Sequence, residues 1–204
     1  KVKGSFARFS RVRAATGMTG AQVAREILRR NNLHDVDVVE TRGMLSDHYD
    51  PRSRTVRLSP EVYRMPSVAA VAVAAHETGH ALQHARQYAP LALRSAAVPV
   101  ARLGSWAPLL IMIGGFGLKM LSLVYVGVIL FAGVVAFQLI TLPVEINAST
   151  RARAELERLR LVSATDAVGV RKVLTAAAMT YVAAAAAAVL QLLYFVSLLG
   201  GRRD

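Results

Sequence analysis

Two long runs of apolar residues dominate the second half of the chain. Residues 120–142 form 23 consecutive positions without a charge, and residues 174–199 form another 26. About 20 apolar residues are enough for a helix to cross the hydrocarbon core of a bilayer. Both runs are therefore predicted to be transmembrane helices.

A shorter apolar run before them predicts a third span. Residues 105–118 include only 14 uncharged positions, but extension back through Arg102 gives a span of about 96–118, with the arginine reaching toward one membrane surface. The glycine-rich segment 114–119 is then predicted to turn, so that the first two spans form a helical hairpin. The alternative for residues 96–118 is a buried or re-entrant helix.

The first 65 residues alternate short apolar patterns with turn residues. Thr19 and Gln22 have the spacing of a capping box, and the apolar residues that follow recur on one face, which predicts a helix over residues 20–30. The Asp50-Pro51 pair predicts a turn. The remaining predicted elements are a strand at 36–39, hairpin strands at 45–49 and 55–58, and a helix at 67–88.

These elements together predict a mainly α integral membrane protein with multispan helices. Residues 1–65 are expected to form a small α+β region outside the membrane. Residues 66–204 are expected to form a membrane-embedded part, and the two parts would make one functional domain. The chain begins at Lys1 rather than Met, so we also expect an amino-terminal segment to be missing.

Composition supports the membrane prediction. The chain is 54% hydrophobic and carries a formal net charge of +12, an unusual combination for a soluble domain. A strong positive charge is also typical of nucleic-acid-binding proteins, but no interleaved aromatic pattern or known module accompanies it here, so we expect no nucleic-acid partner. Cysteine is absent, so any metal site must use histidine and carboxylate ligands.

The helix predicted at 67–88 carries the pattern HExxH, from His76 to His80. Residues four apart lie on one face of a helix, so both imidazoles can reach one metal ion while Glu77 lies beside its bound water. This arrangement is typical of zinc-dependent peptidases. A histidine pair on a helix is also a common surface or core feature, so a third ligand is needed to distinguish the two.

Glu145 is the candidate third ligand. It follows the predicted span 120–142, and no other acidic residue lies between Glu77 and Glu155. Two crossings are predicted between His80 and Glu145, and an even number returns the chain to the side it left. A glutamate at the membrane boundary that is merely solvated is the alternative.

Three segments of the chain resemble a known family. They are Ser46–Asp50 with Val56–Ser59, then Ala74–Gln83, then Leu142–Ser149. The chain resembles the YugP-like membrane-bound neutral zinc metallopeptidases, and more distantly the HtpX-like and CAAX prenyl endopeptidases, which are gluzincins. In the distant relatives the third ligand is the glutamate of an ExxxD pattern. That glutamate corresponds to Glu145, and Ser149 stands in the place of the aspartate.

The resemblance implies an integral-membrane zinc endopeptidase. One Zn²⁺ ion is expected on His76, His80 and Glu145, where it would lower the pKa of its water to about 7 and polarise the scissile carbonyl. Glu77 is expected to act as general base and to pass the proton to the leaving amine. The substrate is expected to be a membrane or membrane-proximal polypeptide.

Other residues are candidates for supporting roles. Ser149, Asn147 and His84 are expected near the metal ligands, where they could orient them. The segment Thr55, Val56, Arg57 and Leu58 is expected to form an edge strand that pairs with an extended substrate, unless it is an ordinary strand of the small sheet. The sequence leaves five candidates open for the oxyanion stabiliser: Tyr49, Tyr88, His48, Asn147 and Arg151.

The distribution of charge predicts the orientation. All but three of the 25 lysines and arginines would lie on the side of the motif helix, the exceptions being Lys119, Arg202 and Arg203. By the positive-inside rule this side is cytoplasmic, which places a multi-pass protein in the cell membrane with its active site facing the cytoplasm. The basic segment 151–160 is expected to touch anionic headgroups.

A second class of function is compatible with the same sequence. The chain could be a non-catalytic membrane scaffold or regulator in which the zinc site is structural or vestigial. Glu77 favours the enzyme, because a structural zinc site needs ligands but no general base.

Overall fold

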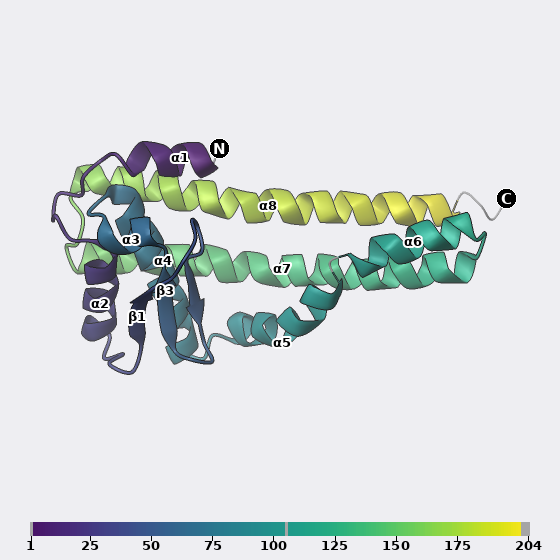
Figure 1. Cartoon of the computed structure of the whole chain (residues 1–204), viewed down its shortest axis with the longest axis horizontal. Coiled ribbons are helices and arrows are strands. Elements are labelled where there is room, and N and C mark those ends of the chain that lie inside the picture. The colour runs from purple at the N-terminus through teal and green to yellow at the C-terminus, as the bar shows by residue number, and fades with distance from the viewer. Residues whose placement is uncertain (1, 105, 201–204) are drawn as a thin grey trace. The chain divides into compact units, whose positions relative to one another are not determined.

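The computed structural model describes residues 2–104 and 106–200 (Figure 1). The chain divides into two compact units, one of Lys1–Leu91 with Val144–Thr180 and one of Ala92–Pro143 with Tyr181–Asp204. The helices are α1 Val2–Phe9, α2 Gly20–Arg30, α3 Pro60–Arg64, α4 Val68–Ala85, α5 Ala89–Gly104, α6 Ala107–Gly117, α7 Leu121–Arg158 and α8 Ala164–Gly200. The strands are β1 Asp37–Glu40, β2 His48–Asp50 and β3 Thr55–Leu58.

The three strands form one small sheet in the order β1-β3-β2. β1 pairs in parallel with β3, and β2 pairs antiparallel with it across the turn predicted at Asp50-Pro51. β3 is therefore the central strand. The prediction that Thr55, Val56, Arg57 and Leu58 form an edge strand is wrong, because β1 and β2 occupy both sides of β3 and leave no free edge for a substrate.

Helix α2 begins as predicted from its cap. The Thr19 side chain accepts a hydrogen bond from the Gln22 backbone, and the Gln22 side chain accepts one from the Thr19 backbone. This reciprocal pair satisfies two of the amide groups that the first turn of a helix leaves without intrahelical partners. The apolar face of α2, which includes Val23 and Ile27, is fully buried.

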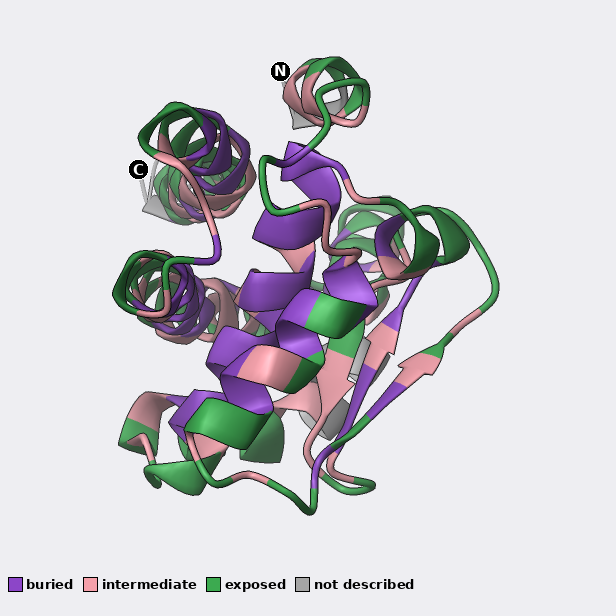
Figure 2. Ribbon diagram, turned by 90° about the vertical axis from the view of Figure 1, so that its left-hand side faces the viewer, coloured by how far each residue is buried: buried purple, intermediate pink, exposed green. Residues whose placement is uncertain are grey.

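Helix α4 runs through the interior of the first unit. The Ser67 side chain caps it by accepting a hydrogen bond from the Ala70 amide. Most residues of α4 are buried, polar ones as well as apolar ones (Figure 2). It ends at Ala85 rather than at residue 88, because Gln87 adopts a left-handed backbone with φ of 50° that cannot continue the helix. This extensive burial restricts the orientations open to the polar side chains of α4.

The same unit also includes the polar ends of α7 and α8. Leu156 of α7 and Val170 and Leu174 of α8 join Val71 of α4 in one hydrophobic core. Asp166 connects the start of α8 with the segment before α2, because its carboxylate accepts hydrogen bonds from the backbone amides of Ser163 and Ala15. α4 and the end of α7 thus belong to one packed body.

The second unit shows a correction to the predicted span 96–118. A break after Gly104 divides the segment into α5 and α6, and Ser105 lies outside the described residues. Pro108 stands in the first turn of α6, where its missing amide N–H is tolerated, whereas inside a continuous helix it would remove a hydrogen bond. The predicted turn falls at Leu118–Met120, with Lys119 at φ of 56°, and the glycines lie within α6.

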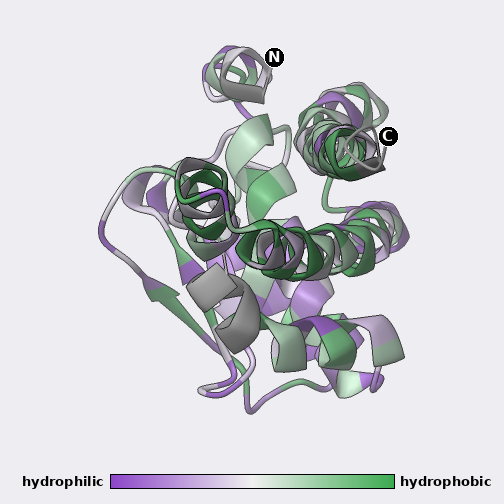
Figure 3. Cartoon of the chain, turned by 90° about the vertical axis from the view of Figure 1, so that its right-hand side faces the viewer, coloured by the Kyte–Doolittle hydropathy of each residue, from purple (hydrophilic) through white to green (hydrophobic). Residues whose placement is uncertain are grey.

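Two helices of the described residues are long and apolar enough to cross a membrane. They are α7, which covers the predicted span 120–142 from Leu121 onward, and α8, which contains the predicted span 174–199. Few side chains along their apolar stretches are buried, and the hydropathy colouring of Figure 3 shows how much of these helices is hydrophobic. A soluble protein rarely exposes so extended an apolar surface, so these stretches fit a hydrocarbon environment.

Candidate metal centre

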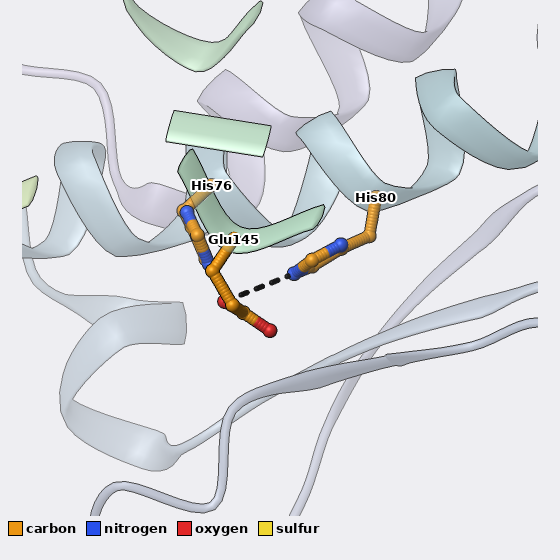
Figure 4. Close-up of side chains that lie close together, drawn as sticks. All are labelled: His76, His80 and Glu145. Carbon is orange, nitrogen blue, oxygen red and sulfur yellow. Dashed lines mark hydrogen bonds and ion pairs between the residues drawn. The ribbon is translucent and has the colours of Figure 1, made fainter. Parts of the chain in front are cut away.

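Helix α4 places the two motif histidines on one face, one turn apart. His76 Nε2 lies 3.1 Å from Glu145 Oε2, and His80 Nε2 lies 3.6 Å from the same oxygen. One ligand atom from each of the three residues lies within 4.8 Å of the others (Figure 4). The structure thus brings together the three residues predicted as ligands, although His80 and Glu145 are 65 positions apart in the chain.

A glycine of the motif permits this approach. A Cβ atom on Gly79 would lie 2.5 Å from the Ala148 carbonyl oxygen of α7, too close for any real side chain. The backbones of α4 and α7 therefore meet at Gly79. Because Glu145 lies one helical turn before Ala148 on α7, this contact brings its carboxylate within reach of both imidazoles.

A buried glutamine sets the orientation of His80. Gln83 is fully buried, and its amide nitrogen donates hydrogen bonds to the Val144 carbonyl oxygen at 2.8 Å and to Asn147 Oδ1 at 3.0 Å. A carbonyl oxygen can only accept, so Gln83 Oε1 must face His80 Nδ1, which lies 3.0 Å away. His80 Nδ1 therefore carries the proton, and the lone pair of Nε2 is directed toward Glu145.

His76 has a similar partner on α7. Ser149 Oγ lies 3.1 Å from His76 Nδ1. With Nδ1 protonated and donating to the serine hydroxyl, the lone pair of His76 Nε2 also points to the centre of the site. The hydroxyl stands where the distant relatives have an aspartate, and it meets His76 without adding a negative charge.

The two buried glutamates of the site have pKa values shifted in opposite directions. In the metal-free site, burial by itself would raise the pKa of the Glu145 carboxyl, but His76 and His80 outweigh it and hold that pKa well below its usual range, because each can donate a hydrogen bond to the carboxylate whenever its Nε2 also carries a proton. A zinc ion would take the place of those Nε2 protons. Burial raises the pKa of Glu77 to about 7, although the nearby His76 and a hydrogen bond from the Tyr49 backbone act in the opposite direction. Glu145 is thus an anionic ligand, whereas Glu77 can exchange a proton near neutral pH.

The other predicted site residues have different positions. Asn147 accepts hydrogen bonds from Gln83 and from Arg151 Nε. Its connection to the metal ligands therefore runs through Gln83, which contacts His80. His84 Nδ1 is hydrogen-bonded to the Tyr49 hydroxyl at 2.8 Å and is not part of the three-residue cluster. Gln83 was missed, although its place three residues after His80 puts it on the helical face next to that histidine.

The donor set fits a catalytic zinc ion. Two histidines and one carboxylate are a known ligand set of zinc hydrolases, and they leave the fourth position of a tetrahedral ion free for water. Ligand atoms about 2.0–2.2 Å from a tetrahedral zinc lie roughly 3.3–3.6 Å apart. Of the separations from Glu145 Oε2 to the two imidazoles, 3.6 Å lies within that range and 3.1 Å is slightly below it.

Comparison with known proteins agrees with this geometry. Residues 1–200 match a family described as "Putative neutral zinc metallopeptidase". The chain belongs to this family. Over all 204 residues it is 48% identical to a Bacillus subtilis protein named "Putative membrane protease YugP", of which it covers 91%. No solved structure matches the chain.

Membership of the neutral zinc metallopeptidase family confirms the resemblance inferred from sequence. The family implies zinc, and in this chain the cluster of His76, His80 and Glu145 is suited to hold it. The name of the Bacillus relative associates that protein with a membrane, in agreement with the two long apolar helices found here.

Proposed function

We propose that this protein is an integral-membrane zinc endopeptidase of the gluzincin type, with one zinc ion held by His76, His80 and Glu145. The observation that carries the proposal is the convergence of these three donors from α4 and α7. Each imidazole is oriented by its own partner, Ser149 or Gln83, so that its free nitrogen faces Glu145. Such preorganised ligands are typical of a functional metal site.

Glu77 is the proposed general base. Zinc bound at the cluster would lower the pKa of a water molecule and polarise the scissile carbonyl group. Glu77 follows His76 directly on α4, is buried, and has a pKa near 7, so its carboxylate can accept the proton of the attacking water and then protonate the leaving amine. A purely structural zinc site would not need a proton acceptor here.

The proposed substrate strand is β2 rather than β3. β2 is an edge strand of the sheet, and the backbone of Tyr49 at its centre is hydrogen-bonded to Glu77. An extended polypeptide that pairs with the free edge of β2 would therefore place a peptide bond beside the general base. Main-chain pairing requires no particular side chain, which suits an enzyme that cleaves polypeptides of varied sequence.

The site geometry also supports a multi-pass topology. If residues 121–142 of α7 cross the bilayer, then Leu121 and Glu145 lie on opposite membrane sides. Glu145 meets α4, so the chain between α4 and Leu121 must reach the far side. α5 and α6 are each shorter than the about 20 residues of a span, and we propose that they cross together as a broken helix.

The proposed active site faces the cytoplasm. The described basic residues outside α5, Lys119 excepted, lie before α5 or between the apolar stretches of α7 and α8, on the side proposed for the metal centre. The positive-inside rule assigns this side to the cytoplasm. The proposed substrate is accordingly a membrane protein or a polypeptide close to the cytoplasmic membrane surface, and a nucleic-acid partner is not proposed.

The test compares zinc content and peptide cleavage in three forms of the full-length protein. Glu77→Gln removes the proton acceptor but no ligand, so we expect it to keep its zinc and to lose cleavage by at least about 100-fold. Glu157→Gln, which changes an exposed glutamate of α7, is the matched control and should cleave like wild type. Full cleavage by zinc-loaded Glu77→Gln would refute the mechanism. Absence of cleavage by zinc-loaded wild type on any membrane substrate tested would favour the scaffold.

A further inference from the structure

A cleft separate from the metal centre lies between α1 and the amino-terminal part of α8. Its volume is about 820 Å³, within the usual range of ligand-binding pockets. Figure 1 shows α1 alongside this part of α8, and all residues that line the cleft belong to the first compact unit. No residue of the proposed catalytic site contributes to it.

The walls of the cleft combine positive charge with apolar surface. Arg8 of α1 and Arg171 and Lys172 of α8 supply three cations, and no acidic residue is among those that line the cleft. Three like charges around one hollow repel one another unless an anion lies between them. Apolar lining comes from Phe9 and Met179, the latter 55% exposed to solvent.

The two kinds of lining residue are ordered along α8. Arg171 and Lys172 directly precede the uncharged run 174–199, and Ala176 and Met179 are in its first two turns. The cleft therefore extends from the last charged residues of α8 into the start of its proposed membrane span. A ligand that matches it must be anionic at one end and apolar at the other.

We propose that an anionic phospholipid of the surrounding bilayer binds in this cleft. Arg8, Arg171 and Lys172 would contact the phosphate of its headgroup, and Phe9 and Met179 would contact its acyl chain near the glycerol. Free phosphate would satisfy only the cationic end. The proposal rests on the membrane location given under the proposed function but not on zinc binding or catalysis.

The cleft is anchored beside the start of the motif helix. A Cβ on Gly169 of α8 would lie 2.8 Å from Val68 of α4 and 2.9 Å from the ring of Phe9 of α1. These three helices therefore meet at Gly169, immediately next to the cleft. A bound lipid would hold α1 against α8 at this contact and so attach the catalytic unit to the membrane surface.

The test measures binding of phosphatidylglycerol and phosphatidylcholine to full-length protein in detergent by native mass spectrometry. The triple variant Arg8→Gln, Arg171→Gln and Lys172→Gln should lose affinity for phosphatidylglycerol by about fivefold per cation removed at low salt. The matched triple Arg42→Gln, Arg52→Gln and Arg86→Gln removes the same charge from exposed positions elsewhere on the unit and should bind like wild type. Equal losses in both triples would show diffuse attraction and overturn the proposal.

Ala176→Phe tests the cleft without a change of charge. The added ring should occupy the space beside Met179 and lower phosphatidylglycerol affinity, whereas unchanged affinity would refute binding in the cleft. Competition by glycerol phosphate as strong as that by the lipid would show a site for free phosphate and overturn the lipid assignment. Glu77→Gln should bind the lipid like wild type, so failure here and failure of the peptidase proposal are distinguishable. A chain that does not enter lipid nanodiscs would refute the membrane location itself.

Discussion

Replacement of Gln83 by methionine tests how the site orients its ligands. Methionine has a similar length and is apolar, so it can fill the fully buried position without the two polar groups of the amide. The variant removes the acceptor that lies 3.0 Å from His80 Nδ1 and the two donors directed to Val144 and Asn147. His80 itself, and with it the ligand set, is unchanged.

The expected effect is a loss of zinc affinity of about 10–100-fold, the usual result when the partner of a metal-binding histidine is removed. Without Gln83 Oε1, the buried N–H of His80 has lost its acceptor, at a cost of about 1–3 kcal/mol. The ring can avoid that cost only by rotation or by a change of tautomer. Either change turns the free nitrogen of His80 away from Glu145.

Competition with a calibrated zinc chelator measures this affinity in detergent-solubilised, full-length protein. Thr78→Val is the matched control, because it removes a buried side-chain hydrogen bond of the same helix, from Thr78 Oγ1 to the Ala74 carbonyl, that does not involve a ligand. Gln83→Glu retains an acceptor for His80 and should restore part of the affinity. An affinity of Gln83→Met within about twofold of that of Thr78→Val would refute the proposed role of Gln83.

Two further predictions follow from the same packing. Gly79→Ala should separate α4 from α7, because the new Cβ would lie 2.5 Å from the Ala148 carbonyl oxygen. Both zinc occupancy and melting temperature should therefore fall. Gly133→Ala is the control: no atom lies within 4 Å of its new Cβ, so it should change neither quantity. Equal zinc occupancy in the two variants would contradict this role of Gly79. In zinc-free protein, the pKa of Glu77 is raised to about 7, so the folded state binds this proton more tightly than the unfolded state and loses that stability as pH rises through about 7. At about pH 8 the free energy of unfolding of Glu77→Gln should therefore exceed that of wild type by up to about 3 kcal/mol, whereas at about pH 5 the two should be similar. Melting curves that differ equally at both pH values would exclude this explanation.

Local patterns predicted those parts of the structure that depend on neighbours in sequence. The capping box of Thr19 and Gln22 predicted the start of α2, and the spacing of His76 and His80 predicted a shared helical face. In both cases a short stretch of chain contained the physical reason for the result. Glu145 was selected differently, from the absence of other acids between Glu77 and Glu155 and from the two crossings predicted between His80 and Glu145.

The features that the sequence did not predict are the strand pairing of β3, the break between α5 and α6, and the contact of Gln83 with α7. Strand order is set by long-range contacts, so the sequence of Thr55–Leu58 could not show that β1 would occupy the side of β3 left free by β2. Gly104 and Pro108 were available as signals for the break between α5 and α6 but were outweighed by the apolar character of the segment. Gln83 was overlooked because its partner on α7 is 61 residues away.

The central claim is that Glu145 completes a zinc site with the two histidines of α4. Metal analysis of purified full-length protein, wild type and Glu145→Ala, tests it most directly, with Glu157→Ala as a control for loss of a carboxylate on α7. The account predicts about one zinc ion per chain in wild type and in the control, and strongly reduced occupancy in Glu145→Ala. Full zinc occupancy in Glu145→Ala would contradict it.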